Sequence, residues 1–138
     1  MKNLIFVFAC LLSFNLYGQT VYTEDQVVSH NHLVCNKSNN LPITGIVKAY
    51  CSYGKFLQSE TPYKDGKKEG LEKRYDCYAG GAIQVEKLFN AGENVGVTKF
   101  YYYHFETGAL KYEASYRDGY LFKKRCFDKS GNEIPCED

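Results

Sequence analysis

An internal repeat is the feature of this sequence that most restricts its fold. Three segments of the 138-residue chain align on a glycine at spacings of 25 and 26 residues, and they read GIVKAY at 45–50, GLEKRY at 70–75 and GVTKFY at 96–101. Each has an aliphatic residue second, a lysine fourth and a tyrosine sixth. A degenerate fourth copy begins at Phe122, with Arg125 in the lysine position and Phe127 in the tyrosine position. A fixed period of this length predicts a repeat protein in which each unit packs on its neighbours.

The segments between these copies repeat as well. Each runs from a glutamate to an aromatic residue three positions on and to a glycine three positions further. The three sets are Glu60, Tyr63 and Gly66; Glu86, Phe89 and Gly92; and Glu113, Tyr116 and Gly119. Apolar and polar residues alternate between these points, as in LKYEASY at 110–116. A period of two, bounded by Gly, Asp and Asn, indicates strands joined by tight turns in which glycine adopts positive φ.

These patterns predict an all-β fold, an open antiparallel meander of β-hairpin repeats with about seven strands. We expect strands near 45–51, 55–63, 70–76, 82–89, 96–103, 109–117 and 121–127. Pro62 has no N–H to donate, so we expect it at a sheet edge or a strand end. An open meander has two edges, and segments 19–41 and 128–138 are expected to cover them.

The repeat resembles a known family. The run from Pro42 to Gly45, PITG, and the turn YKDGKKEG at 63–70 resemble the MORN-variant repeat of YwqK-type antitoxin proteins, over about 42–131. The resemblance implies a long meander of β-hairpins, no catalytic residues, and a role in toxin–antitoxin pairs. Together with the pattern of the first residues, described next, it predicts three parts: a signal peptide at 1–18, an N-terminal segment at 19–41 and a MORN-like domain at 42–138.

The first 18 residues have the pattern of a secretory signal peptide. Lys2 precedes an apolar run from Leu4 to Leu16, and Gly18 offers a small residue for cleavage. The alternatives are an uncleaved anchor, a buried N-terminal strand, or a lipoprotein acylated at Cys10, for which the surrounding residues match the usual motif poorly. No later apolar run is long enough to span a bilayer. The sequence therefore predicts a secreted or periplasmic protein without a transmembrane segment after cleavage.

The remaining cysteines fit that compartment. They are Cys35, Cys51, Cys77, Cys126 and Cys136, and none forms a C-x-x-C pair. Because five is an odd number, we expect one or two structural disulfides and at least one free or intermolecular thiol. The pairing stays open at this point.

The repeated lysines and tyrosines are the candidate binding face: Lys48, Tyr50, Lys73, Tyr75, Lys99 and Tyr101. An open sheet rich in tyrosine suits protein recognition. The alternative is structural, with stacked tyrosine rings building the sheet and lysine stems covering them.

Other chemistry has weaker support. His30, His32 and Cys35, with Asp25 nearby, could bind zinc or copper if the chain is extended there, but a fourth ligand is lacking. The glutamates at 60, 86 and 113 should stack on one sheet face, where equal environments do not suit acid–base catalysis. With 17 basic and 16 acidic residues the chain has no electrostatic signature for nucleic acid.

We therefore expect a non-enzymatic binding protein without a cofactor or metal. Its partner would be a protein, either a toxin that it neutralises or an envelope component. The alternatives are an envelope-associated structural scaffold and a small metal-binding protein.

Overall fold

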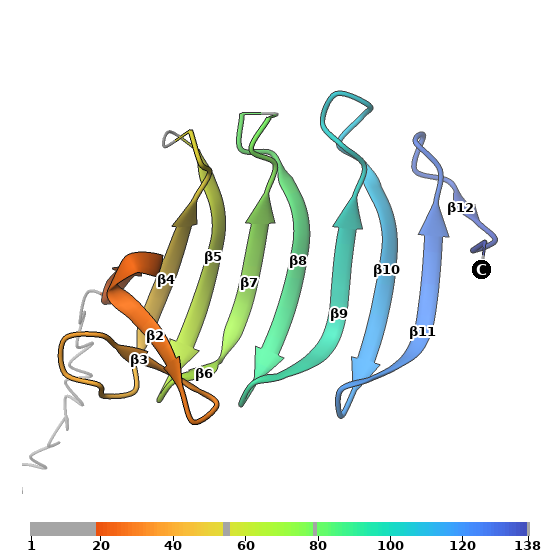
Figure 1. Cartoon of the computed structure of the whole chain (residues 1–138). Helices are drawn as coiled ribbons and strands as arrows, with labels where there is room; N and C mark the ends of the chain where they lie inside the picture. The colour runs from red at the N-terminus through yellow and green to blue at the C-terminus, as the bar shows by residue number, and fades with distance from the viewer. Residues whose placement is uncertain (1–18, 54–55, 79, 138) are drawn as a thin grey trace, which may run out of the picture.

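One open sheet contains most of the strands. The computed structural model describes residues 19–53, 56–78 and 80–137, and this part of the chain is all-β (Figure 1). The sheet has ten strands in the order β1-β4-β5-β7-β8-β9-β10-β11-β12, with β6 beside β5. Their bounds are β1 Val21–Thr23, β4 Gly45–Tyr50, β5 Leu57–Lys64, β6 Lys67–Lys68, β7 Gly70–Tyr75, β8 Ile83–Asn90, β9 Glu93–Tyr101, β10 Leu110–Arg117, β11 Tyr120–Phe127 and β12 Glu133–Ile134.

The expected meander is confirmed, but the expected number of strands is too low. The seven predicted strands correspond to β4, β5 and β7–β11, which pair in antiparallel fashion along the chain. The three additional strands are only two or three residues long, too short for a period of two to be visible in sequence. The strand expected over 96–103 ends at Tyr101, so Tyr102 and Tyr103 lie in the following loop.

Tight turns join the strands at one end of the sheet. The central residues of these turns are Asp65-Gly66, Ala91-Gly92 and Asp118-Gly119, and all six have positive φ. Two consecutive positive φ values define the type I′ hairpin, whose twist matches that of the flanking strands. The turn strings found in the sequence therefore have the function predicted for them.

Both flanking segments pair with the ends of the sheet, as expected. At the N-terminal end, β1 lies parallel to β4, an orientation that the sequence did not indicate. The strands β2 (Val27–His30) and β3 (Leu33–Asn36) form a separate hairpin, preceded by one 3₁₀ turn at Glu24–Gln26. This hairpin is joined to the first tight turn, because Val34 N–H donates to the Gly66 carbonyl at 2.8 Å. At the other end, β12 pairs with β11.

Pro62 does not lie at an edge or a strand end, contrary to expectation. It is inside β5, opposite Ile46 of β4. On its other side β5 changes partner from β7 to β6, and the Glu69 N–H donates to the Pro62 carbonyl across that interruption at 3.0 Å. The N–H that proline lacks would point to the same interrupted side, so the sheet loses little there.

The two faces of the sheet differ. Successive side chains of a strand point to opposite faces. We call the face that bears Lys48, Lys73 and Lys99 the ladder face, and the other the packed face. The most buried strand residues all belong to the packed face: Val47, Ala49, Thr61, Glu72, Thr98 and Ala114. The flanking segments lie on the packed face too, since Glu24 shares a cavity with Ala49 and Pro135 shares one with Lys124.

Candidate functional site: the ladder face

A row of alternating charges crosses the ladder face from β4 to β12. Strand pairing places Lys48 opposite Glu60, Glu60 opposite Lys73, Lys73 opposite Glu86, Glu86 opposite Lys99, Lys99 opposite Glu113, and Glu113 opposite Arg125. Glu133 of β12 completes the row through an ion pair with Arg125. Basic and acidic residues therefore alternate over eight strands. Opposite charges on directly paired residues stabilise a sheet, whereas like charges would weaken it.

Irregular positions in the hairpins create this register. The tight turn pairs Lys64 with Lys67 and, if the ladder continued without interruption, would place Glu60 opposite Leu71. Glu60 instead pairs with Lys73, because the chain shifts by two residues around Glu69 and Gly70. A similar shift of two residues in the second hairpin brings Glu86 to Lys99 instead of Val97. The glycines that open the second and third copies of the repeat lie at these shifts, with φ of 108° at Gly70 and 66° at Gly96.

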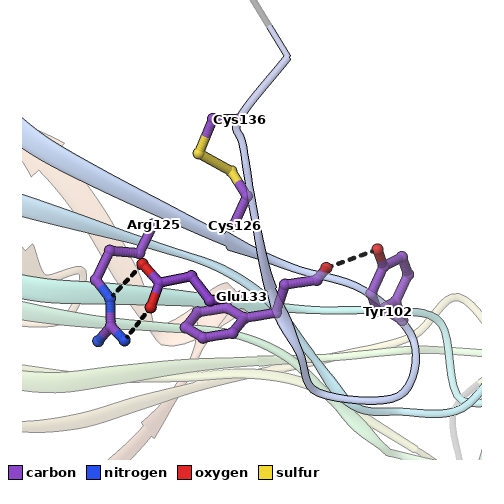
Figure 2. The surroundings of a disulfide bond; sticks show 6 residues. Tyr102, Arg125, Cys126, Glu133 and Cys136 are labelled. Carbon is purple, nitrogen blue, oxygen red and sulfur yellow. Dashed lines mark hydrogen bonds and ion pairs between the residues drawn. A yellow bond between two sulfur atoms is a disulfide. The ribbon is translucent and has the colours of Figure 1, made fainter.

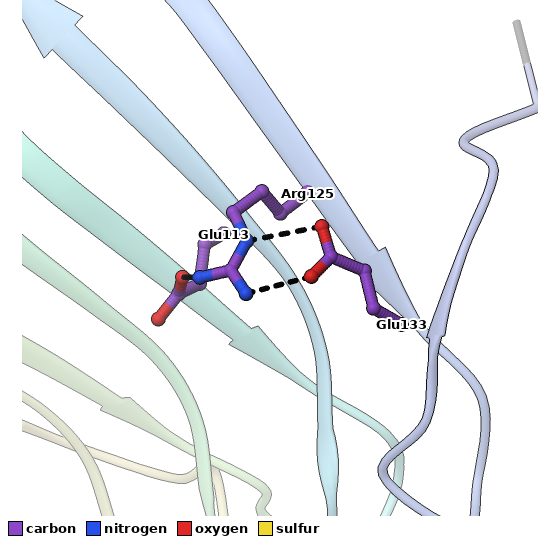
Figure 3. Close-up of polar contacts among 3 residues, drawn as sticks. All are labelled: Glu113, Arg125 and Glu133. Atoms are coloured by element: carbon purple, nitrogen blue, oxygen red, sulfur yellow. Dashed lines mark hydrogen bonds and ion pairs between the residues drawn. The ribbon is translucent and has the colours of Figure 1, made fainter.

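Ion pairs fix the ends of the row. Lys48 Nζ lies 3.1 Å from Glu60 Oε1. At the other end, Arg125 Nε and Nη2 donate to the two carboxylate oxygens of Glu133 at 3.1 and 2.7 Å. Its Nη1 donates to Glu113 at 3.3 Å, so one guanidinium joins three strands (Figure 3). Bidentate contacts of this kind are the stronger class of exposed ion pair.

The centre of the row is arranged differently. Tyr75 O–H donates to Glu60 Oε2 at 2.9 Å, and Tyr101 O–H donates to Glu86 Oε2 at 2.7 Å. Neither Lys73 nor Lys99 has a carboxylate oxygen within 4.0 Å in the described part of the chain. Their ammonium groups therefore remain available to an incoming group.

The protonation states of Tyr75, Tyr101 and Glu60 follow from these contacts. Burial, the hydrogen bond to Glu60 and the nearby carboxylate charges raise the pKa of Tyr75 to about 12. Burial, the bond to Glu86 and the carboxylate charges have the same effect on Tyr101, whose pKa is also raised to about 12. Burial alone would raise the pKa of Glu60, but the hydrogen bonds from Lys48 and Tyr75 and the lysine charges outweigh it and lower that pKa. Near neutral pH, the tyrosines are donors and Glu60 is an acceptor.

The six residues of the candidate binding face do lie on one face, but this face is not a basic stripe. Each lysine is next to at least one glutamate, so the row as a whole is close to neutral. The repeated glutamates stack on the same face, as the sequence indicated. Their neighbours are lysines of paired strands, not the sequence neighbours Lys87 and Lys111.

A row of aliphatic side chains runs beside the charges and was missed in the sequence. Leu71, Leu88 and Val97 are 43%, 40% and 42% exposed, and Leu71 is directly opposite Leu88. The signal was present, since the second residue of each copy is aliphatic and lies two positions before the lysine. Val97 lies on the next strand, two residues from Val95, the residue that pairs with Leu88. Exposed aliphatic residues grouped on one face are more informative than scattered ones, because such patches mark interaction sites.

Glu72 is a buried carboxylate within a strand, on the packed face. Glu72 is 3% exposed, and its Oε1 contacts Lys68 Nζ at 2.7 Å, Arg74 Nη2 at 3.5 Å and the Thr61 hydroxyl at 3.3 Å. Burial would raise the pKa of Glu72, but the hydrogen bond from Lys68 and the charges of Lys68 and Arg74 outweigh it and lower that pKa. Its Oε2 is buried without a hydrogen-bond partner in the described chain. A glutamate in an alternating strand reads as a surface residue, so its burial was not foreseen.

Two disulfides are present: one joins neighbouring copies of the repeat, and the other joins the fourth copy to the C-terminal segment. Cys51 pairs with Cys77 across 26 residues, the period of the repeat, and Cys126 pairs with Cys136. Near the second disulfide, Tyr102 O–H donates to the Phe127 carbonyl at 2.9 Å and joins the third and fourth copies (Figure 2). Cys35 is a buried free thiol. Two disulfides fit an oxidising compartment, whereas the signal peptide and Cys10 lie outside the described residues.

The prediction of an extended segment that presents His30 and His32 to a metal ion is wrong. The chain turns at Asn31 and His32, which have φ of 49° and 63°, so His30 and His32 belong to a hairpin turn. Cys35 is buried in β3 with its Sγ directed to the Leu33 carbonyl, 3.9 Å away. Within residues 19–137, apart from the undescribed positions, no three His, Cys, Asp or Glu side chains are grouped to hold a metal ion.

A second basic–aromatic cluster occupies the packed face near the C-terminus. Lys111 Nζ lies 5.5 Å from the centre of the Tyr102 ring, and Lys124 Nζ lies 5.2 Å from that of Tyr112. All four residues line a cavity of about 370 Å³. Glu137 lines it as well, so the lysines already have an acidic neighbour there.

No helix among the described residues has the length and apolar character needed to cross a bilayer. The resemblance to MORN-variant repeats stays a prediction. The chain matches no protein-family model, no curated protein and no solved structure.

Proposed function

We propose that the protein is a non-enzymatic binding protein that works beyond the cytoplasmic membrane and holds another protein on its ladder face. One observation carries the proposal: the row formed by Leu71, Leu88 and Val97 is exposed beside the charge row, on the face that the flanking segments leave open. Apolar residues next to ordered charges and tyrosines are the composition of protein interfaces.

The charges would set specificity, and the apolar row would supply most of the affinity. Lys73 and Lys99 have no carboxylate within 4.0 Å in the described chain, so each can accept one from a partner without breaking an existing ion pair. Tyr75 and Tyr101 are held by their hydroxyl groups, so their rings lose little freedom on binding. The disulfides and the tight turns keep the platform rigid.

The resemblance to YwqK-type proteins supports a narrower version, in which the partner is a toxin that the protein neutralises. The oxidising compartment indicated by the disulfides would place that encounter outside the cytoplasm. An envelope-associated scaffold is the alternative, since a repeat sheet can also hold a structural component in place.

The test is capture of partners from the native host by the tagged full-length chain, compared with the Lys73→Glu/Lys99→Glu variant. We expect one stoichiometric protein, lost in the double variant and retained by the matched control Lys37→Glu, which changes an exposed lysine outside the ladder face. Capture that is unchanged in the double variant would show that the ladder face is not the site. Recovery of the protein only with insoluble envelope material would favour the scaffold.

A further inference from the structure

We propose that the ladder face binds the ladder face of a second copy of the chain, in a face-to-face pair with a twofold axis parallel to the strands. This inference rests on the proposed function, because it names the partner of the same surface. It comes from the order of charges along the row, which is basic, acidic, basic, acidic through all eight strands from Lys48 to Glu133.

The order of the strands decides which charges meet in such a pair. A twofold axis between two sheets, parallel to the strands and between β8 and β9, reverses the strand order in the second copy. The first residue of one row then faces the last residue of the other. Because the row has eight members and alternates in sign, each charge meets its opposite. Glu86 faces Lys99 of the second copy, and Lys73 faces Glu113 of the second copy.

Two other kinds of face-to-face arrangement lack this match, and an axis between any other two strands would match fewer charges. If the twofold axis ran across the strands, each residue would face the same residue of the second chain, so that Lys73 meets Lys73 and Glu86 meets Glu86. A shift of the centre onto a single strand has the same result, because each residue then faces one of like charge. Like charges brought together across an interface cost several kcal/mol, which excludes these arrangements.

The apolar row fits the same symmetry. An axis parallel to the strands leaves each row at its own height, so the aliphatic row of one copy lies on that of the other. Leu88 of β8 and Val97 of β9 flank the axis. Leu88 of each copy would therefore cover Val97 of the other copy. They are 40% and 42% exposed in the single chain. Pairing thus removes from water the side chains that the fold leaves exposed.

The dimensions are sufficient for a specific interface. Eight strands about 4.8 Å apart span roughly 38 Å, and six residues of about 3.3 Å each span roughly 20 Å. This area, at most roughly 770 Å² with all eight strands overlapping, is close to the ~800 Å² that each partner contributes to a standard interface. Aligned sheets cross at about 30°, so the pairs nearest the axis stay in register while the outer pairs diverge. The pairs of Glu86 with Lys99 and of Lys73 with Glu113 are the ones to test.

The experiment measures self-association of the full-length secreted chain by sedimentation equilibrium. We expect a dimer for the wild type and at least about tenfold weaker association for Lys73→Glu and for Glu113→Lys, because each puts two like-charge pairs in the interface. An equimolar mixture of these two variants should regain wild-type affinity, since both pairs become complementary in the mixed dimer.

The matched control is a mixture of Lys73→Glu with Glu86→Lys, which leaves two like-charge pairs and should not regain affinity. Rescue in this control as well would overturn the proposed register. Leu88→Gln changes no charge and should weaken the dimer about tenfold, which keeps the test valid if a charge variant folds poorly.

A wild-type chain that stays monomeric at its solubility limit would overturn the inference. If its capture of a host protein still depended on Lys73 and Lys99, the proposed function would stand without it. If the chain dimerised with the expected rescue but captured no host protein, the ladder face would be a self-association surface alone.

Discussion

Removal of the Cys51–Cys77 disulfide should destabilise the protein more than removal of Cys126–Cys136. The bonds close loops of 26 and 10 residues. In the chain-entropy account, a cross-link lowers the entropy of the unfolded chain more when its loop is longer, which corresponds to about 3.5 kcal/mol for the first and about 2.7 kcal/mol for the second at 25 °C. The expected difference, about 0.8 kcal/mol, depends only on loop length and is the sharper quantity.

The variants are Cys51→Ser/Cys77→Ser and Cys126→Ser/Cys136→Ser. Both partners are replaced together, because a single replacement would leave a thiol able to exchange with the free Cys35. Free energies of unfolding come from urea titrations by linear extrapolation. Since the chain has 13 tyrosines and no tryptophan, tyrosine fluorescence and circular dichroism are the two signals, and their agreement checks two-state behaviour.

The reverse order of the two losses would refute the reasoning. A loss below about 1 kcal/mol for the Cys51–Cys77 pair would do the same. Either result would mean that contacts between repeats in the unfolded chain, or changes in the folded loops, decide the contribution of the bond.

Three further predictions follow from single side chains. Glu72→Gln should cost roughly 1–3 kcal/mol at neutral pH, because Lys68 loses a charged partner. The pKa of Glu72 is lowered in the folded state, so its stabilisation is fully present above the ordinary pKa of 4.5 and is lost as the pH falls through the lowered value. Acid unfolding of the variant and the wild type will show this difference. Tyr101→Phe should remove one of the tyrosines that ionise near pH 12 in a spectrophotometric titration. Gly96→Ala should cost roughly 1–2 kcal/mol, and Ala91→Gly should gain a smaller amount, because both positions have positive φ.

Each of these has an outcome that contradicts it. An acid unfolding curve that is the same for Glu72→Gln and wild type would show that the carboxylate is not ionised in the fold. An unchanged alkaline titration of Tyr101→Phe would mean that Glu86 does not hold the hydroxyl proton. For the turn variants, equal signs at positions 96 and 91 would show that backbone conformation is not what matters there.

The strands and turns were predictable because they depend on local chemistry. Alternation of polar and apolar residues fixes which side chains share a face, and Gly66, Gly92 and Gly119 mark turns that need positive φ. The short strands β1, β6 and β12 were not predictable, since each exists only through its pairing with a longer neighbour. The burial of Glu72 also depends on other parts of the chain, since Lys68, Arg74 and Thr61 form its environment.

The candidate site was predicted in its residues but not in its character. The sequence indicated that the lysines and tyrosines share a face and that the glutamates share a face. It did not show that both sets share the same face, with basic and acidic residues alternating. The spacing of the histidines suggested an extended metal-binding segment, which is wrong. The turn there has positive φ at Asn31 and His32, and the sequence offers no glycine to mark it.

The repeat, the alternation of polar and apolar residues and the number of cysteines can all be read from the amino-acid sequence. The strand register cannot, because it depends on the two-residue shifts at Gly70 and Gly96, which move Glu60 from Leu71 to Lys73 and Glu86 from Val97 to Lys99. A turn sets the first pairs of a hairpin through local geometry. A bulge is retained only when the pairing beyond it is better, and that comparison involves residues on two strands and the charges between them.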